Sequence, residues 1–453
     1  MRRNASHALG RIVPLAMLPL AELLVLVALA GPSGAQTPTD VRIDITRGVG
    51  TRIRIHCEAL QTAADRNSVS WGAQANEVLA HDLDWSAVFT VSRSWVAGQQ
   101  PVEVQAVVGG RLTISGTEVR LQGEVRDFPA RRSIMAKEYR ASLKDWRTAV
   151  HQFADDIVLQ FTGEAGVSQT RIAFIGQSGR TKDLYVMDYD GARVAPLTSD
   201  QSIALSPSWS PEGSLVLFTS YRGGGGPRLF VIPVAAGRPY LISGRPGINT
   251  SGSYSPDGRQ IVCTLSHEGN SEIYLLDARG ASPQRLTNSR GIDTSPAWSP
   301  TGREIAFTSD RTGTPQVHVM DREGGNLRRL NYDVSYTDSP AWSPKGDRIA
   351  FVARAGGGFD VYTCRPDGSD TRLVVSGGSN ENPRWSPDGR HLVFSSTREG
   401  GRGLFVSDLD GTPPRRLATG SLSALSPAWS PRPAASGSAF GVNPGSSNPG
   451  GQP

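Results

Sequence analysis

The segment TSPAWSPTGREIAFT, residues 294–308, contains the pattern that decides the fold. Its centre, an aromatic residue followed by Ser-Pro, occurs six times in the chain, at spacings of 45, 44, 44, 43 and 44 residues. Self-similarity at about 40 to 45 residues is typical of a β-propeller, in which each repeat forms a blade of about four strands. We therefore predict a mainly β fold built around a six-bladed β-propeller. The six aromatic residues are Trp209, Tyr254, Trp298, Trp342, Trp385 and Trp429.

Each repeat reads as short strands separated by turns. In one repeat, the runs Glu304–Thr308, Gln316–Met320 and Leu327–Leu330 are bounded by turn residues, as strands require. The aromatic side chain is expected to fill the space between adjacent sheets, and the following Ser-Pro ends its strand because proline donates no ladder hydrogen bond. Asp-Gly pairs such as Asp257-Gly258 predict turns. None has the spaced acidic residues of a calcium loop, so we predict no metal and no cofactor.

The two ends of the repeat region predict how the ring closes. The last copy, at Trp429, has no strands after it. Conversely, Arg171–Ile175 matches the second strand of a repeat but has no aromatic-Ser-Pro before it. We expect the segment ending at Trp429 to complete the first blade, which would remove an exposed sheet edge and lock the circle over residues 166–433.

Residues 36–165 contain no repeat and predict a small α/β domain in front of the propeller. Apolar residues at helical spacing indicate helices there, and alternating ones indicate strands. The expected elements are a strand over Val41–Ile45, a helix from about Gly72 to Trp85, two strands within Val102–Asp127 joined at Ser115-Gly116, a strand over Ser133–Tyr139 and a helix over Leu143–Phe161. Residues 434–453 are mostly Gly, Ser, Pro and Asn, and predict a disordered tail.

The first 35 residues read as a signal peptide. Arginines precede an apolar run, Leu23–Ala30, and small residues follow it, which predicts cleavage between Ala35 and Gln36. Pro14, Pro19 and Glu22 interrupt the apolar stretch, which argues against a membrane anchor. We expect an exported mature chain without a membrane span.

Composition excludes several classes of protein. Three cysteines, Cys57, Cys263 and Cys364, cannot pair completely and are far apart in the sequence, so neither a disulfide scaffold nor a cysteine zinc site organises the fold. The net charge of +5 comes from 47 basic and 42 acidic residues spread along the chain. That distribution lacks the basic stripe of a nucleic-acid binder.

The segments that lead into the innermost strands should gather at one mouth of the propeller channel. They are expected to be short polar loops on rigid blades, which suits a hydrogen-bonded socket for a protein loop, although ordinary turn chemistry explains the same residues. The candidate residues are Leu205, Asn249, Thr250, Ser251, Asp293, Thr294, Thr337, Asp338, Glu381 and Asn382.

The arrangement resembles the TolB family, the periplasmic components of the Tol-Pal system of Gram-negative envelopes. The most specific likeness is GIDTSPAWSP at residues 291–300, followed by FTSDR at residues 307–311. The segments Tyr254–Gly258 and Glu272–Tyr274 fit the same pattern. The chain departs from the family at Arg52–Glu58, where a Pro-Ile-rich strand followed by Pro-Phe is usual, and in the low-complexity tail.

The resemblance implies a non-catalytic periplasmic scaffold that supports outer-membrane integrity and constriction at cell division. It implies that the propeller mouth receives the peptidoglycan-associated lipoprotein Pal, and Asn249, Ser251 and Thr294 match the centre of the family's Pal contact. It also implies that the mature N-terminal stretch communicates with the inner-membrane protein TolA. That stretch includes Val41, Arg42, Ile43 and Asp44.

Two other functions fit a propeller. Similar repeats precede the catalytic domain of prolyl-oligopeptidase-type peptidases, but this chain has no G-x-S-x-G motif and only 24 residues after Trp429. A peptidase-related propeller without its hydrolase domain would still fit. A lectin or small-ligand binder that uses the central channel is the second alternative.

Overall fold

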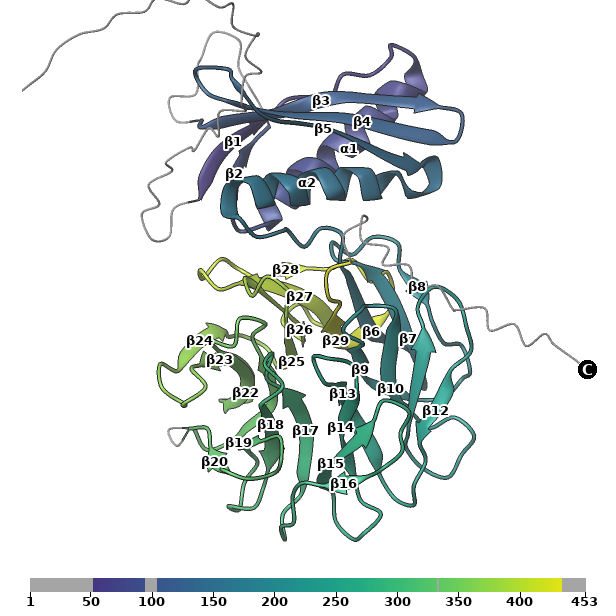
Figure 1. Ribbon diagram of the computed structural model, residues 1–453, viewed down its shortest axis with the longest axis vertical. Helices are drawn as coiled ribbons and strands as arrows, with labels where there is room; N and C mark the ends of the chain where they lie inside the picture. Colours follow the sequence, from purple (N-terminus) through teal and green to yellow (C-terminus); the bar gives the residue numbers. More distant parts are fainter. Residues whose placement is uncertain (1–51, 94–103, 332–333, 434–453) are drawn as a thin grey trace, which may run out of the picture. The chain divides into compact units, whose positions relative to one another are not determined.

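The computed structural model describes residues 52–93, 104–331 and 334–433 (Figure 1). All of them belong to the compact unit Arg47–Pro453. The predicted signal peptide, the predicted strand over Val41–Ile45 and the predicted tail lie outside the described residues. The prediction that the α/β domain spans residues 36–165 and the propeller residues 166–433 stays a prediction.

The first described part is a five-stranded sheet with two long helices, α1 and α2, on one face (Figure 1). Strand β1 pairs in parallel with β2 and β3, and β3, β4 and β5 form an antiparallel meander. A Cβ atom on Gly123 would lie 2.5 Å from the Phe153 ring, so glycine is required for α2 to pack on β4. The elements are β1 (Ile53–Cys57), α1 (Arg66–Trp85), β2 (Phe89–Ser92), β3 (Ala106–Ser115), β4 (Glu118–Asp127), β5 (Ser133–Ser142), the 3-10 helix η1 (Leu143–Asp145) and α2 (Trp146–Thr162).

Two expectations for this part need correction. Helix α1 begins at Arg66 rather than near Gly72, because the Asp65 side chain accepts a hydrogen bond from the Ser68 N–H at 2.9 Å and caps the helix. Strands β1 and β2 were not predicted from the sequence. They are only five and four residues long, which is too short for a clear sequence pattern. Pairing of β1 with β2 and with β3 stabilises them in the fold.

The remaining described residues form six four-stranded sheets, one for each predicted blade. From the channel outwards, the sheets are β9 (Ala204–Trp209), β10 (Leu215–Ser220), β11 (Arg228–Pro233), β12 (Tyr240–Ser243); β13 (Asn249–Tyr254), β14 (Gln260–Leu265), β15 (Glu272–Asp277), β16 (Gln284–Arg285); β17 (Asp293–Trp298), β18 (Glu304–Ser309), β19 (Gln316–Asp321), β20 (Arg328–Arg329); β21 (Thr337–Trp342), β22 (Ile349–Ala355), β23 (Gly358–Cys364), β24 (Arg372–Val375); β25 (Asn380–Trp385), β26 (His391–Ser396), β27 (Gly403–Asp408), β28 (Arg415–Arg416); and β29 (Ser423–Trp429), β6 (Arg171–Ser178), β7 (Thr181–Asp188), β8 (Ala195–Pro196).

The predicted ring closure is confirmed. Strand β29 pairs antiparallel with β6, with Ser423 opposite Gln177 and Trp429 opposite Ile172. The last strand of the chain therefore completes the blade that the start of the propeller leaves unfinished, and the six-bladed fold is closed.

The repeated aromatic residue joins neighbouring blades, as predicted. Trp209 donates its indole N–H to the Ala428 carbonyl at 2.9 Å, and Trp385 donates to the Ala341 carbonyl at 3.0 Å. The serine that follows closes the next turn: the Ser210 hydroxyl, for example, accepts from the Leu215 N–H at 3.0 Å. The Trp-Ser-Pro unit thus fixes both the packing between blades and the turn within one.

Candidate functional site

Each innermost strand carries a β-bulge, which the sequence pattern does not predict. The register with the second strand shifts in all six blades of the described chain. At each shift, a non-glycine residue three positions before the aromatic residue has a φ between 45° and 54°. Such a left-handed backbone is uncommon outside glycine, and its recurrence shows that the bulge belongs to the repeat. The sequence signal is a serine or asparagine at this position, and the residues are Ser206, Ser251, Ser295, Ser339, Asn382 and Ser426.

The innermost strands of all six blades line a channel cavity of about 400 Å³. Its walls are serine, proline, alanine and the ends of the repeated aromatic residues. Hydrogen bonds link two bulges to a third: Asn382 Nδ2 donates to Ser339 Oγ, and Ser426 Oγ donates to Asn382 Oδ1, both at 3.4 Å. Among the described residues that line the cavity, Arg384 is the one charged side chain.

The prediction that the mouth residues form loops is wrong. They are the first residues of the innermost strands, because their backbones pair with the second strand of the same blade: Asn249 lies opposite Leu265, Asp293 opposite Ser309 and Thr337 opposite Ala353. Their Asn, Asp, Ser and Thr composition is typical of turns, but pairing within the sheet overrides that preference.

Three of the ten predicted mouth residues are fully buried and serve the blades. Asn249 Oδ1 accepts from Ser243 Oγ at 2.7 Å, and its Nδ2 donates to the Arg245 carbonyl at 2.8 Å. Asp293 pairs with Arg311 at 2.6 Å. Thr337 accepts from the Val317 N–H at 2.8 Å. Burial raises the pKa of Asp293 even though its hydrogen bonds and the Arg311 charge favour the carboxylate.

The other seven predicted residues are half-buried and stand near the start of five of the six innermost strands. Two of them bridge neighbouring blades: the Thr250 and Thr219 hydroxyls are 3.0 Å apart, and Thr308 donates to Asp338 Oδ1 at 2.8 Å. Ser251 and Asn382 also line the channel cavity. We call Leu205, Thr250, Ser251, Thr294, Asp338, Glu381 and Asn382 the mouth ring.

An apolar arc accompanies the mouth ring. Ile203, Ile248 and Ile292 each stand directly before the innermost strand of their blade, and their exposed fractions are 37%, 41% and 54%. Tyr221, whose N–H donates to the Ile203 carbonyl, is 40% exposed. Exposed apolar side chains rimmed by polar groups are typical of protein-binding surfaces.

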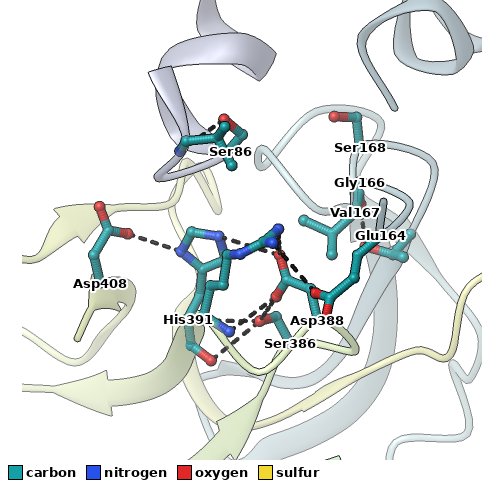
Figure 2. A network of polar contacts seen from close by, with 12 residues as sticks. Ser86, Glu164, Gly166, Val167, Ser168, Ser386, Asp388, His391 and Asp408 are labelled. Carbon is teal, nitrogen blue, oxygen red and sulfur yellow. Dashed lines mark hydrogen bonds and ion pairs between the residues drawn. The ribbon is translucent and has the colours of Figure 1, made fainter. Parts of the chain in front are cut away.

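A second polar cluster lies inside the blade of β25 to β28, away from solvent (Figure 2). His391 Nδ1 is 2.8 Å from Asp408 Oδ1, and its Nε2 is 3.8 Å from Asp388 Oδ2. The Ser386 hydroxyl donates to Asp388 and not to the imidazole. All four residues are at most 2% exposed, and a serine nucleophile needs access and a bond to its base. This cluster therefore supports the blade and does not resemble a hydrolase site.

Ion pairs connect this cluster to residues outside the blade. Arg415 and Arg52 contact Asp408 at 2.8 and 2.9 Å. Burial alone would raise the pKa of Asp408, but the hydrogen bond with His391 and the two guanidinium groups hold it below its ordinary value. Arg390 contacts Glu164 at 3.2 Å, and Glu164 belongs to the segment between α2 and β6 (Figure 2).

The described residues contain neither a metal-binding cluster nor a membrane-spanning helix. Within residues 52–93, 104–331 and 334–433, no group of three or more His, Cys, Asp or Glu side chains is placed to hold a metal ion. In the same residues, no helix is both long and apolar enough to cross a membrane.

Known proteins resemble the chain in sequence and in fold. Tol-Pal system protein TolB of Desulfosudis oleivorans is 38% identical over 175 residues, which cover 39% of this chain and 40% of that protein. Tol-Pal system protein TolB of Roseobacter denitrificans is 33% identical over 234 residues, which cover 47% of this chain and 52% of that protein. The match thus spans about half or less of these relatives.

The crystal structure of TolB from Acinetobacter baumannii has the same fold. Its TM-score is 0.75 at 24% identity, and the match covers 84% of this chain and 97% of that chain. The family described as TolB beta propeller domain matches residues 158–433, which is more than half of the chain. Together with the closed ring of six blades, these matches show that the chain belongs to the TolB family.

Proposed function

We propose that this protein is a non-catalytic periplasmic scaffold of the Tol-Pal system. In this proposal the propeller mouth binds a Pal-type peptidoglycan-associated lipoprotein, and the N-terminal stretch with Val41, Arg42, Ile43 and Asp44 binds a TolA-type inner-membrane protein. The complex would support outer-membrane integrity and constriction at cell division. The names of the curated relatives and the exported character predicted for the chain support this assignment.

The mouth ring is the observation that carries the Pal-binding part. Its side chains stand on strands that each blade holds in register, so a partner meets a rigid surface and little order is lost on binding. The neighbouring Ile248 and Ile292 add apolar area, and aromatic or aliphatic contacts beside hydrogen bonds are typical of protein interfaces. The three buried residues, Asn249, Asp293 and Thr337, would position the ring rather than contact the partner.

Thr294 offers the sharpest test of this site. Its hydroxyl makes no hydrogen bond with another described residue, and the side chain is half-buried on β17. In Thr294→Ile, a partner group that the hydroxyl satisfies would be buried without a hydrogen bond, which costs about 1 to 3 kcal/mol. Titration calorimetry with a purified Pal-type lipoprotein domain should show an affinity about five- to 150-fold lower.

The matched control is Thr301→Ile. Thr301 belongs to the same blade but is exposed in the turn after Trp298-Ser299-Pro300, at the opposite end of β17. It should leave the affinity unchanged. Thr308 is unsuitable as a control, because it supports Asp338 of the mouth ring. Equal affinities for wild type, Thr294→Ile and Thr301→Ile would eliminate the mouth ring as the binding site.

The TolA-binding part is tested separately. Replacing Val41–Asp44 with Gly-Ser residues should abolish capture of a TolA-type protein from crosslinked envelopes and leave the calorimetric affinity for the lipoprotein domain unchanged. If the Gly-Ser variant keeps both the capture of the TolA-type protein and the affinity for the lipoprotein domain, the assignment of TolA binding to this stretch is rejected. A glycan-array hit would favour the lectin alternative, and reproducible peptide hydrolysis by the pure protein would favour the peptidase-related one.

A further inference from the structure

Arg384 occupies a position that is small and uncharged in every other blade. It stands directly before the aromatic residue of β25, where the other innermost strands have Ser208, Ser253, Ala297, Ala341 and Ala428. All six positions line the channel cavity of about 400 Å³. The five equivalent side chains are small, so Arg384 is the one long side chain at this position of the channel wall.

Among the described residues, the Arg384 guanidinium has no ion-pair partner. No carboxylate of a described residue forms an ion pair with it, and its one hydrogen bond runs from Nη1 to the adjacent Pro383 carbonyl at 2.8 Å. A guanidinium has five N–H donors, so most of them are left for another group. By contrast, Arg311 in the blade of β17 is satisfied by Asp293 at 2.6 Å.

One carboxylate compensates for the Arg384 charge only in part. Asp338 acts on Arg384 through space, but its Oδ1 already accepts from Thr308 at 2.8 Å and from the Ser339 N–H at 2.6 Å. Burial in the channel lowers the pKa of Arg384 to about 10, against the opposing effect of Asp338. Arg384 is half-buried and burial lowers its pKa, so an anion in the channel would supply the counter-charge that this partly desolvated cation lacks.

Hydroxyl groups supply further donors around the same space. The half-buried side chains of Ser208, Ser251, Ser253 and Ser295 line the cavity and make no hydrogen bond to another described side chain or backbone group. A carboxylate accepts bidentate hydrogen bonds from arginine and single ones from hydroxyls. The donor set suits an anion, whereas the positive charge disfavours a cation.

We infer that the channel below the mouth ring binds a carboxylate group at Arg384, supplied by an acidic side chain of the protein segment that enters the mouth. The source of the carboxylate rests on the proposed function, while the carboxylate site itself does not. The apolar arc and mouth ring would hold the segment at the surface, and the acidic side chain would reach Arg384 between them. A free small carboxylate has the same chemistry and is the other source to be distinguished.

The test uses three variants of the full mature chain and two probes. Arg384→Gln removes the charge, Arg384→Lys keeps it, and Arg290→Gln removes an exposed arginine that precedes β17 on the mouth side. The probes are the purified Pal-type lipoprotein domain, in calorimetry, and succinate, in an NMR titration. We expect Arg384→Gln to lower the affinity for the lipoprotein domain at least about 10-fold, Arg384→Lys to retain most of it and Arg290→Gln to leave it within about twofold.

Each outcome decides a separate point. If Arg384→Gln weakens binding of the lipoprotein domain while Arg384→Lys and Arg290→Gln do not, the result supports a carboxylate that the partner supplies. Succinate binding by the wild type that is lost in Arg384→Gln, with lipoprotein binding unchanged, supports the site with a free carboxylate as its ligand and overturns the partner as the source. If Arg384→Gln changes neither titration, the carboxylate site is rejected. If the lipoprotein domain does not bind even the wild type, the proposed function fails, and the succinate titration still tests Arg384.

Discussion

Asp155 shows how a single buried carboxylate fixes the segment between α2 and the propeller. It is 5% exposed and accepts hydrogen bonds from the Ser168 N–H at 2.7 Å and from the Gln169 N–H and Nε2 at 3.1 Å. A Cβ atom on Gly166 would lie 2.2 Å from Asp155 Oδ1, so only glycine fits at this position beside the carboxylate. The sequence shows an Asp on a helix, but not the partners that its fold supplies.

The charge state of Asp155 predicts a pH dependence of stability. Burial raises the pKa of Asp155 to about 6, although its three hydrogen bonds oppose the shift. Because the folded pKa lies above the ordinary value of about 4, the native state binds the proton more tightly than the unfolded state between these values. The contribution of Asp155 to the free energy of unfolding should therefore fall as pH rises from about 4 to 6, by up to about 2 kcal/mol, and then stay constant.

Urea denaturation of wild type and Asp155→Asn at pH 4, 5, 6 and 7.5 measures this contribution. The advantage of the wild type over the variant should be largest at pH 4 and should shrink toward pH 6. Asp155→Asn should also cost about 1 to 3 kcal/mol, because the amide N–H₂ would face donors. Parallel pH curves for the two proteins would show that Asp155 titrates normally in the folded state.

At the scale of single strands, the repeat was predictable and the site was not. The Trp-Ser-Pro unit acts locally, through turn closure at Ser210 and an indole hydrogen bond from Trp209, so its pattern survives in the sequence. The bulges at Ser206 and Ser251 depend on pairing with the second strand, and a serine in the sequence does not indicate a positive φ. The polar composition of the mouth residues predicts loops, whereas register within the blade makes them strands.

Strand β29 carries the closure of the ring, and truncation tests it. A chain that ends at Leu425 would lose most of β29, leave the edge of β6 unpaired and remove the Ala428 carbonyl that accepts from Trp209. Unpaired strand edges promote aggregation, so we expect aggregation or a broad unfolding transition. Scanning calorimetry and light scattering provide the measurement.

A shorter truncation is the control for this experiment. Deleting Ala434–Pro453 removes none of the described strands and should leave the melting temperature nearly unchanged. If both truncated chains melt like the full one, pairing of β29 with β6 does not hold the propeller closed.

On the scale of the whole molecule, a buried polar contact joins the α/β part to the propeller. Tyr189, which follows β7, donates its hydroxyl to Asp82 Oδ1 of α1 at 2.7 Å. His151 of α2 contacts the other oxygen of Asp82 through Nδ1 at 2.6 Å. Burial alone would lower the pKa of His151, but the Asp82 carboxylate has the larger effect, so the pKa of His151 is raised above its ordinary value. All three side chains are at most 2% exposed, so breaking this contact leaves polar groups without water.

Because the contact is buried, Tyr189→Phe should weaken the coupling between the two parts. Asp82 would lose one of its donors, and a buried acceptor without its partner costs about 1 to 3 kcal/mol. We expect a lower free energy of unfolding and, in scanning calorimetry, a transition that broadens or separates into two, since weaker coupling between two domains lets them unfold independently. Tyr185→Phe is the matched control: Tyr185 stacks on Phe174 with ring centroids 5.5 Å apart, and its hydroxyl makes no hydrogen bond to another described residue. A variant at Tyr189 that unfolds like the one at Tyr185 would mean that the hydrogen bond to Asp82 does not couple the α/β part to the propeller.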